Sequence, residues 1–231
     1  FASRDRANAL LRARLVIGRV AQRKASQIHT YPWYAYVACG DPQIRHLKTV
    51  TGPRLYIDID DVLAETTRAL AKTARTRFGK NIPFEKMTTF NLRISLQLQE
   101  HEYESFMLEV HKPEFLRALA PTAGAPDVLD AWKNSGARIE LVTGRPPSSQ
   151  QATIDWLEDH SIAYDSLEFI DKYRRYPGES TTQLSDLAGR NYKFAIEDSA
   201  SVATYLAENT SSCVLLYDRP WNQSGPLADG S

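Results

Sequence analysis

Three of four consecutive positions, Asp58, Asp60 and Asp61, carry carboxylates where a run of β-branched and aromatic residues ends. The run, residues 55–59, predicts a buried strand, so the acids stand at its carboxyl end. Like charges at this spacing repel one another, and each is costly to bury unless a cation neutralises it. Ligands of open α/β sheets bind at the carboxyl ends of the strands. The acids therefore indicate a site for a metal, a phosphate or both.

Polar residues also follow the next predicted strands along the chain. Those strands are three short apolar segments, at residues 139–142, 167–170 and 194–196. The polar residues that come after them are Thr143, Lys172, and the acid pair Glu197 and Asp198. Because parallel strands end at one edge of a sheet, we expect these side chains to gather with the acids of the first strand. One polar strand end would be unremarkable, whereas four in succession predict a site.

These residue types match the needs of phosphoryl transfer. Asp58 can attack phosphorus and form an acyl phosphate, which divides a slow hydrolysis into two easier steps. Asp60 shares the strand face and can protonate the leaving oxygen, then deprotonate the attacking water. Thr143 and Lys172 can hold the non-bridging oxygens of the phosphate. The distal acid pair, together with Asp58, supplies the hard oxygen ligands that Mg²⁺ prefers.

The alternation of strands and helices predicts an α/β fold, a Rossmann-like parallel sheet flanked by helices and joined by right-handed crossovers. Turn residues at 51–53 mark the start of this domain, which we expect to span residues 51–231. A helix is predicted at 182–187 and a last strand at 214–217. The stretch between the first two strands is too long for one crossover helix. We therefore expect a small helical cap inserted after the first strand, at about residues 64–121.

Residues 1–50 differ in charge from the rest of the chain. They carry nine Lys and Arg against two Asp and Glu, whereas residues 51–231 carry nineteen against twenty-six. The Arg-rich composition of residues 7–24 suits a targeting segment or a poorly ordered extension. The aromatic cluster at 31–36 is typical of residues that pack on a surface. We expect a basic N-terminal extension that lies outside the domain.

The composition is that of a globular protein, with 42% hydrophobic and 24% charged residues and a formal net charge of zero. No apolar run approaches the roughly 20 residues that a membrane-spanning helix needs. The two cysteines, Cys39 and Cys213, match no metal or redox spacing, which favours reduced thiols. We expect a cytoplasmic protein, or one of an organelle matrix if residues 1–50 are a transit segment.

The motif residues resemble those of a known enzyme superfamily. Residues 58–63, Asp-Ile-Asp-Asp-Val-Leu, are similar to the first motif, D-x-D-x-[TV]-L, of the haloacid dehalogenase-like (HAD) phosphatases. The other three motifs follow in the same order, at residues 141–144, Lys172 and residues 196–198. Within the superfamily, residues 112–125 and the pair Asp171-Lys172 resemble the 5′(3′)-deoxyribonucleotidase group. The resemblance covers about residues 54–218.

The resemblance implies a role for each candidate residue at the reacting phosphate. It implies Asp58 as the nucleophile and Asp60 as the general acid and base. It also implies that Thr143, Gly144 and Lys172 surround and bind the substrate phosphate.

The resemblance further implies a bound Mg²⁺. The ion would be held by Asp58, the main-chain carbonyl of Asp60 and Asp198, with Glu197 completing the acidic site. Two residues depart from the pattern of the group. Glu197 stands where the group usually has Asp, and Arg145 replaces a small or proline-like residue near the phosphate. These departures bear on the substrate more than on the reaction.

We therefore expect a Mg²⁺-dependent phosphatase that hydrolyses a small phosphomonoester, with a (deoxy)nucleoside monophosphate as the first choice. A cap over the site would exclude macromolecules, so no nucleic-acid polymer is expected as a partner. A sugar-phosphate or other small-metabolite phosphatase of the same superfamily is the alternative. A non-catalytic phosphate-binding or receiver-like module is a more distant one, because receiver domains place the acid pair first. The oligomeric state, a homodimer included, is left open.

Removal of residues 1–50 is expected to leave the turnover number unchanged, because no motif residue lies there. A chain that begins at Thr51 would be compared with the full chain by steady-state kinetics. Loss of soluble expression would show instead that the aromatic cluster at 31–36 packs on the domain. A turnover number that falls by more than about tenfold in soluble, folded protein would contradict the prediction.

Overall fold

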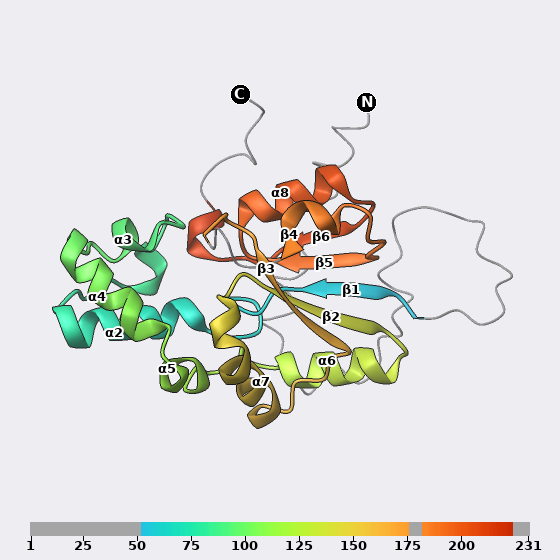
Figure 1. The fold of residues 1–231 in the computed structure, drawn as a ribbon, viewed down its shortest axis with the longest axis horizontal. Coiled ribbons are helices and arrows are strands. Elements are labelled where there is room, and N and C mark those ends of the chain that lie inside the picture. Colours follow the sequence, from blue (N-terminus) through green and yellow to red (C-terminus); the bar gives the residue numbers. More distant parts are fainter. Residues whose placement is uncertain (1–51, 176–181, 224–231) are drawn as a thin grey trace, which may run out of the picture.

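The computed structural model describes residues 52–175 and 182–223, so the predicted extension at 1–50 lies outside the described residues. Six parallel strands form one sheet in the order β4-β3-β2-β1-β5-β6. Their bounds are β1 Arg54–Ile57, β2 Arg138–Thr143, β3 Ser166–Asp171, β4 Thr182–Gln183, β5 Phe194–Glu197 and β6 Cys213–Leu216. β1 lies in the middle of the sheet, between β2 and β5 (Figure 1). The predicted α/β fold with a parallel sheet is confirmed.

Helices cover both faces of the sheet. Ile57 of β1 belongs to a core shared with α6 (Ala125–Asn134) and α7 (Gln150–Asp159), whereas Tyr56 belongs to a second core shared with α8 (Ala200–Asn209). Figure 1 shows α6 and α7 on one side of the sheet and α8 on the other. Because successive side chains point to opposite faces and both faces are covered, the central strands have nearly continuous apolar sequences.

One predicted helix is replaced by an edge strand. The sequence pattern predicts a helix at 182–187, but the structure places the two-residue strand β4 there, followed by the 3₁₀ helix η5 (Leu184–Leu187). β4 pairs with the end of β3, and the carboxylate of Asp186 accepts the N–H of Gln183 at the start of η5. The prediction is wrong because six residues give a helix little intrinsic stability, whereas the open edge of β3 offers backbone partners.

A helical insertion separates β1 from β2. Its elements are α2 (Thr66–Phe78), η3 (Phe84–Lys86), α3 (Leu92–Ser95), α4 (Glu100–Val110) and α5 (Pro113–Arg117). It has an apolar core of its own, in which Leu70 of α2 packs with Phe106 of α4. Figure 1 shows the insertion beyond the end of the sheet toward which β1 and β5 run. In the described part of the chain, neither these helices nor any others have the length and apolar character needed to cross a membrane.

The two connections between the sheet and the helical insertion are bonded to each other. The N–H of Glu65 donates to the carbonyl of Ala120 (2.9 Å), and the N–H of Thr122 donates to the carbonyl of Leu63 (2.7 Å). The chain therefore enters and leaves the insertion through one paired segment, which sets the insertion at the carboxyl edge of the sheet.

Gly52→Ala is expected to destabilise the fold by about 1–3 kcal/mol, because a methyl group has no room there. A Cβ at this position would lie 1.6 Å from the carbonyl oxygen of Gly136, a backbone atom that cannot yield unless the turn before β2 moves. Urea unfolding would measure the change. Gly189→Ala is the matched control, because a Cβ at Gly189 meets no atom within 4 Å. Equal stability of the two variants would contradict the prediction.

Candidate active site

The end of β1 presents the first acid of the site. Asp58 directly follows β1, and its N–H donates to the carbonyl of Ile196 on the neighbouring β5 (3.0 Å). The chain then turns tightly, and Asp61 takes a left-handed conformation with φ 58°, which glycine adopts more readily. The carboxylate of Asp61 accepts the N–H of Thr67 in the first turn of α2 (3.0 Å). Asp61 thus fixes the loop between Asp58 and the helical insertion.

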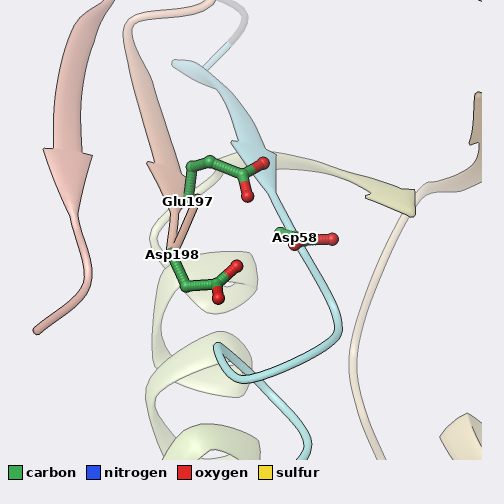
Figure 2. Close-up of side chains that lie close together, drawn as sticks. All are labelled: Asp58, Glu197 and Asp198. Atoms are coloured by element: carbon green, nitrogen blue, oxygen red, sulfur yellow. The ribbon is translucent and has the colours of Figure 1, made fainter. Parts of the chain in front are cut away.

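Three buried carboxylates meet at this edge of the sheet. Asp58 comes from the end of β1, and Glu197 and Asp198 come from the end of β5 (Figure 2). One oxygen of each lies within 4.8 Å of the others, and none of the three residues is more than 4% exposed. The adjacency of β1 and β5 therefore produces an acidic cluster from residues far apart in the sequence.

One ammonium group lies among these acids. Lys172 Nζ is 2.9 Å from Oδ1 of Asp58 and 2.8 Å from Oε2 of Glu197. Burial would lower the pKa of Lys172, but the two carboxylates outweigh burial and raise that pKa. Burial, reinforced by the charge of Glu197, raises the pKa values of Asp58 and Asp198 well above their ordinary range. One cation among three carboxylates leaves the cluster with excess negative charge.

Glu197 is already held by protein groups at both of its oxygens. Oε2 accepts from the hydroxyl of Tyr56 (2.7 Å) and from Lys172, and Oε1 accepts from the N–H of Ser199 (3.2 Å). Burial would raise the pKa of Glu197, but Lys172 outweighs burial and lowers that pKa. These bonds suit a residue that orients Lys172 better than one that binds a metal directly.

Asp58 and Asp198 each keep one oxygen available. Oδ1 of Asp58 accepts from the N–H of Ile59 (2.7 Å) and from Lys172, and Oδ2 of Asp198 accepts from the indole N–H of Trp221 (3.0 Å). Within the described part of the chain, no group donates a hydrogen bond to the other oxygen of either acid. Two such oxygens beside excess negative charge fit a hard divalent cation such as Mg²⁺.

The side chain of Asp60 lies outside the acidic cluster. Its carboxylate accepts from Arg145 at both oxygens (3.0 Å from Nε and 2.7 Å from Nη2) and from the hydroxyl of Thr66 (2.6 Å). Burial would raise the pKa of Asp60, but Arg145 outweighs burial and lowers that pKa. The predicted metal role of Asp60 concerns its main-chain carbonyl and stays a prediction.

The three predicted phosphate ligands lie side by side at the ends of β2 and β3. Thr143 is fully buried, and its hydroxyl accepts the N–H of Arg145 (3.2 Å). A Cβ at Gly144 would lie 3.3 Å from Cδ of Lys172 and 3.3 Å from the ring of Tyr173. Glycine therefore allows the close approach that places these groups together.

Two residues of the site were not among the predicted ones. Tyr56 lies within β1 and donates to Glu197, and Trp221 follows β6 and donates to Asp198. A usable signal exists for Tyr56, because a hydroxyl inside a buried strand needs a hydrogen-bond partner. For Trp221 the signal is weaker, because its place just after a strand only puts it at the carboxyl edge of the sheet.

Parts of this sequence are similar to known proteins. A family model described as 5′ nucleotidase, deoxy (Pyrimidine), cytosolic type C protein matches residues 53–178. Protein retinal degeneration B of Drosophila melanogaster is 35% identical over 66 residues, which are 28% of this chain and 5% of that protein. Membrane-associated phosphatidylinositol transfer protein 1 of Homo sapiens is 39% identical over 49 residues, 21% of this chain and 4% of that protein. The chain thus spans no more than 5% of the length of these two relatives.

Solved structures also resemble the chain. A crystal structure of a predicted phosphoglycolate phosphatase from Haemophilus somnus 129pt is 16% identical with a TM-score of 0.48, over 76% of this chain and 90% of that one. A crystal structure of a putative phosphoglycolate phosphatase from Lactobacillus delbrueckii subsp. bulgaricus is 14% identical with a TM-score of 0.49, over 71% of this chain and 84% of that one.

Asp58→Asn is expected to lower kcat by at least about 10³-fold, because an amide cannot form the acyl phosphate. The metal-free variant should resist heat at least as well as the wild type, since the substitution removes one of three buried like charges. Steady-state kinetics and thermal melts would measure both effects. Asp218→Asn, at an exposed acid that follows β6, is the control and should retain activity. A near-normal rate for Asp58→Asn would rule out covalent catalysis by this residue.

Proposed function

Since this chain belongs to the family of 5′ nucleotidase, deoxy (Pyrimidine), cytosolic type C proteins and is a HAD-like phosphoric monoester hydrolase, we propose that it hydrolyses a (deoxy)nucleoside monophosphate with Mg²⁺. The observation that carries the proposal is the cluster of three buried carboxylates with the one ammonium of Lys172. A bound Mg²⁺ would supply the positive charge that offsets repulsion between these acids and a phosphate dianion.

In the first half of the proposed reaction, Asp58 becomes phosphorylated. One carboxylate oxygen of Asp58 attacks phosphorus, and the bond from phosphorus to the ester oxygen breaks as the new bond forms. Protonated Asp60 gives its proton to the leaving oxygen, which requires its carboxyl to turn away from Arg145. Lys172 and the end of β2 hold the non-bridging oxygens while charge develops on them.

In the second half, water releases the phosphate. Asp60, now a carboxylate, takes a proton from the water that attacks the aspartyl phosphate. The bond from phosphorus to Asp58 breaks, which frees inorganic phosphate and restores the Asp58 carboxylate. The paired connections of the helical insertion place it over the same edge of the sheet, where it can exclude bulk water and macromolecules.

Aromatic side chains beside the phosphate ligands favour a substrate that carries a base. Phe90 of the helical insertion meets Tyr173 with ring centroids 5.5 Å apart, and Tyr173 directly follows Lys172. Phe90 is 40% exposed, so part of its face is accessible. Aromatic rings can stack on nucleobases, and this pair borders the predicted phosphate site.

A sugar phosphate or another small phosphomonoester is the second candidate. Arg145 favours it, because a buried guanidinium next to the predicted phosphate ligands could bind a further anionic or hydroxyl group of a small substrate. The non-catalytic phosphate-binding or receiver-like alternative has less support, since the chain matches the nucleotidase family over residues 53–178.

A panel of phosphomonoesters assayed with Mg²⁺ is expected to give the highest kcat/KM for deoxyribonucleoside monophosphates. Exhaustive chelation should abolish turnover, and added Mg²⁺ should restore it. A preference of at least about tenfold for sugar phosphates, equivalent to about 1.4 kcal/mol of transition-state binding, would overturn the nucleotidase proposal. Turnover that persists after chelation would overturn the metal requirement.

Variants of two exposed apolar residues refine this experiment. Phe90→Ala should raise KM for nucleotides more than KM for glycerol phosphate, because only the nucleotide offers a base to stack. Leu108→Ala is the matched control on α4 of the same insertion, where the side chain is 76% exposed. An equal rise in KM for both substrates would contradict base stacking on Phe90.

A further inference from the structure

A short turn after β6 reaches back to the acidic cluster. It comprises Arg219 and the 3₁₀ helix η6 (Pro220–Asn222), and we call it the C-terminal turn. It lies outside residues 53–178, which the family model matches. We propose that Trp221 of this turn is a positioning residue, which holds one oxygen of Asp198 so that the other is presented to the divalent cation. The inference rests on the proposed function, because it concerns the same metal site.

The C-terminal turn is fixed by its own backbone and by Asn222. Pro220 restricts φ at the start of η6, and the N–H of Asn222 donates to the carbonyl of Arg219 (3.1 Å). The side-chain oxygen of Asn222 accepts the N–H of Arg219 (3.1 Å). Its side-chain nitrogen donates to the carbonyls of Tyr217 and Asp198, both at 2.8 Å. The turn is therefore bonded directly to the main chain of the acid that Trp221 contacts.

Trp221 bonds the carboxylate itself. Its Nε1–H donates to Oδ2 of Asp198 at 3.0 Å, which restricts rotation of the carboxylate and leaves Oδ1 for a cation. An indole N–H is a neutral group that donates and cannot accept. It can therefore orient Asp198 without cancelling the negative charge that attracts the cation. A lysine or arginine at the same place would cancel it.

Contacts of Trp221 and of its neighbour Arg219 hold the C-terminal turn in place. The ring of Trp221 meets Phe84 of the helical insertion edge to face, with centroids 5.8 Å apart. The neighbouring Arg219 is buried, donates from Nε to the carbonyl of Asp61 (2.7 Å) and pairs with Glu65 (3.2 Å). Asp61 and Glu65 lie in the loop that follows β1. The C-terminal turn thus joins the segments that follow β1 and β5, which carry Asp58 and Asp198.

A purely structural role for the turn has a different consequence. If the turn only closed the core, loss of the indole N–H would lower thermal stability and leave the metal affinity of the folded protein unchanged. A positioning role lowers the metal affinity. It also leaves kcat at saturating metal near the wild-type value, because Trp221 acts through Asp198.

The test compares wild type with Trp221→Phe in the full chain. Mn²⁺ serves as the probe ion, and the EPR signal of free Mn²⁺ gives the bound fraction without substrate. Trp221→Phe keeps a ring against Phe84 and removes the donor, so the Mn²⁺ dissociation constant should rise about tenfold to a hundredfold. The Mg²⁺ concentration for half-maximal turnover should rise in parallel, with kcat at saturating Mg²⁺ within about twofold of wild type.

Two more variants separate the lost hydrogen bond from a change of shape. Trp221→β-(3-benzothienyl)alanine replaces the ring N–H by sulfur and keeps the size of the side chain, so it should show the same loss of affinity. Trp156→Phe is the matched control, because Nε1–H of Trp156 on α7 donates to the carbonyl of Leu119 (2.8 Å) and bonds none of the acids. Its Mn²⁺ dissociation constant should equal that of wild type.

Each outcome bears on one part of the inference. Unchanged Mn²⁺ affinity in both Trp221 variants would overturn it and leave the proposed phosphatase standing. Equal losses of Mn²⁺ affinity in Trp221→Phe and Trp156→Phe would also overturn it. The loss would then come from removing any buried indole hydrogen bond, and not from the bond to Asp198. Wild-type protein that hydrolyses its substrate yet binds no Mn²⁺ would overturn the proposed metal site and the inference with it.

Discussion

The ion pairs that Lys172 makes with Asp58 and Glu197 hold three strand ends together. Lys172 follows β3, Asp58 follows β1 and Glu197 ends β5, so the lysine stem must cross the end of β2, which lies between β3 and β1. It crosses at Gly144, where a Cβ would lie 3.3 Å from the stem. Loss of Lys172 would leave Asp58 and Glu197 without their cation, and such unpaired buried charge typically costs about 3–5 kcal/mol. The same contact therefore serves the stability of the sheet edge and the geometry of the site.

A second cation gives the two acids of the first motif different surroundings. Lys172 pairs with Asp58, which stays within the acidic cluster, and there burial and the charge of Glu197 raise the pKa of Asp58. Arg145 takes Asp60 out of that cluster and outweighs burial, which lowers the pKa of Asp60. Two carboxyls that stand two residues apart thus differ in charge environment, and Asp60 must leave Arg145 before it can carry the proton of a general acid.

The site residues that directly follow an apolar strand pattern could be predicted from the sequence. The contacts that depend on the conformation of the loops after the strands could not. An apolar run that ends in an acid, such as residues 55–59, places Asp58 at the sheet edge without knowledge of the tertiary structure. The pairing of Arg145 with Asp60 joins residues 85 apart and depends on the course of the loop after β2. Trp221 reaches Asp198 from the short 3₁₀ helix η6, and no periodicity in the sequence shows where its indole lies. The two-residue strand β4 is too short for any periodicity.

The order of strands in the sheet also determines when the acidic cluster can form. Tyr56 of β1 and Glu197 of β5 are bonded across 141 residues of sequence, and contacts between such distant segments are slow to form during folding. β1 can pair with β2, and β2 with β3, over shorter separations. Lys172 can therefore reach the sheet edge with β3 before β5 docks on the other side of β1. In that order of folding, Lys172 reaches the sheet edge before Glu197 and Asp198 arrive with β5. The three carboxylates are then buried together only when the ammonium group of Lys172 is already present.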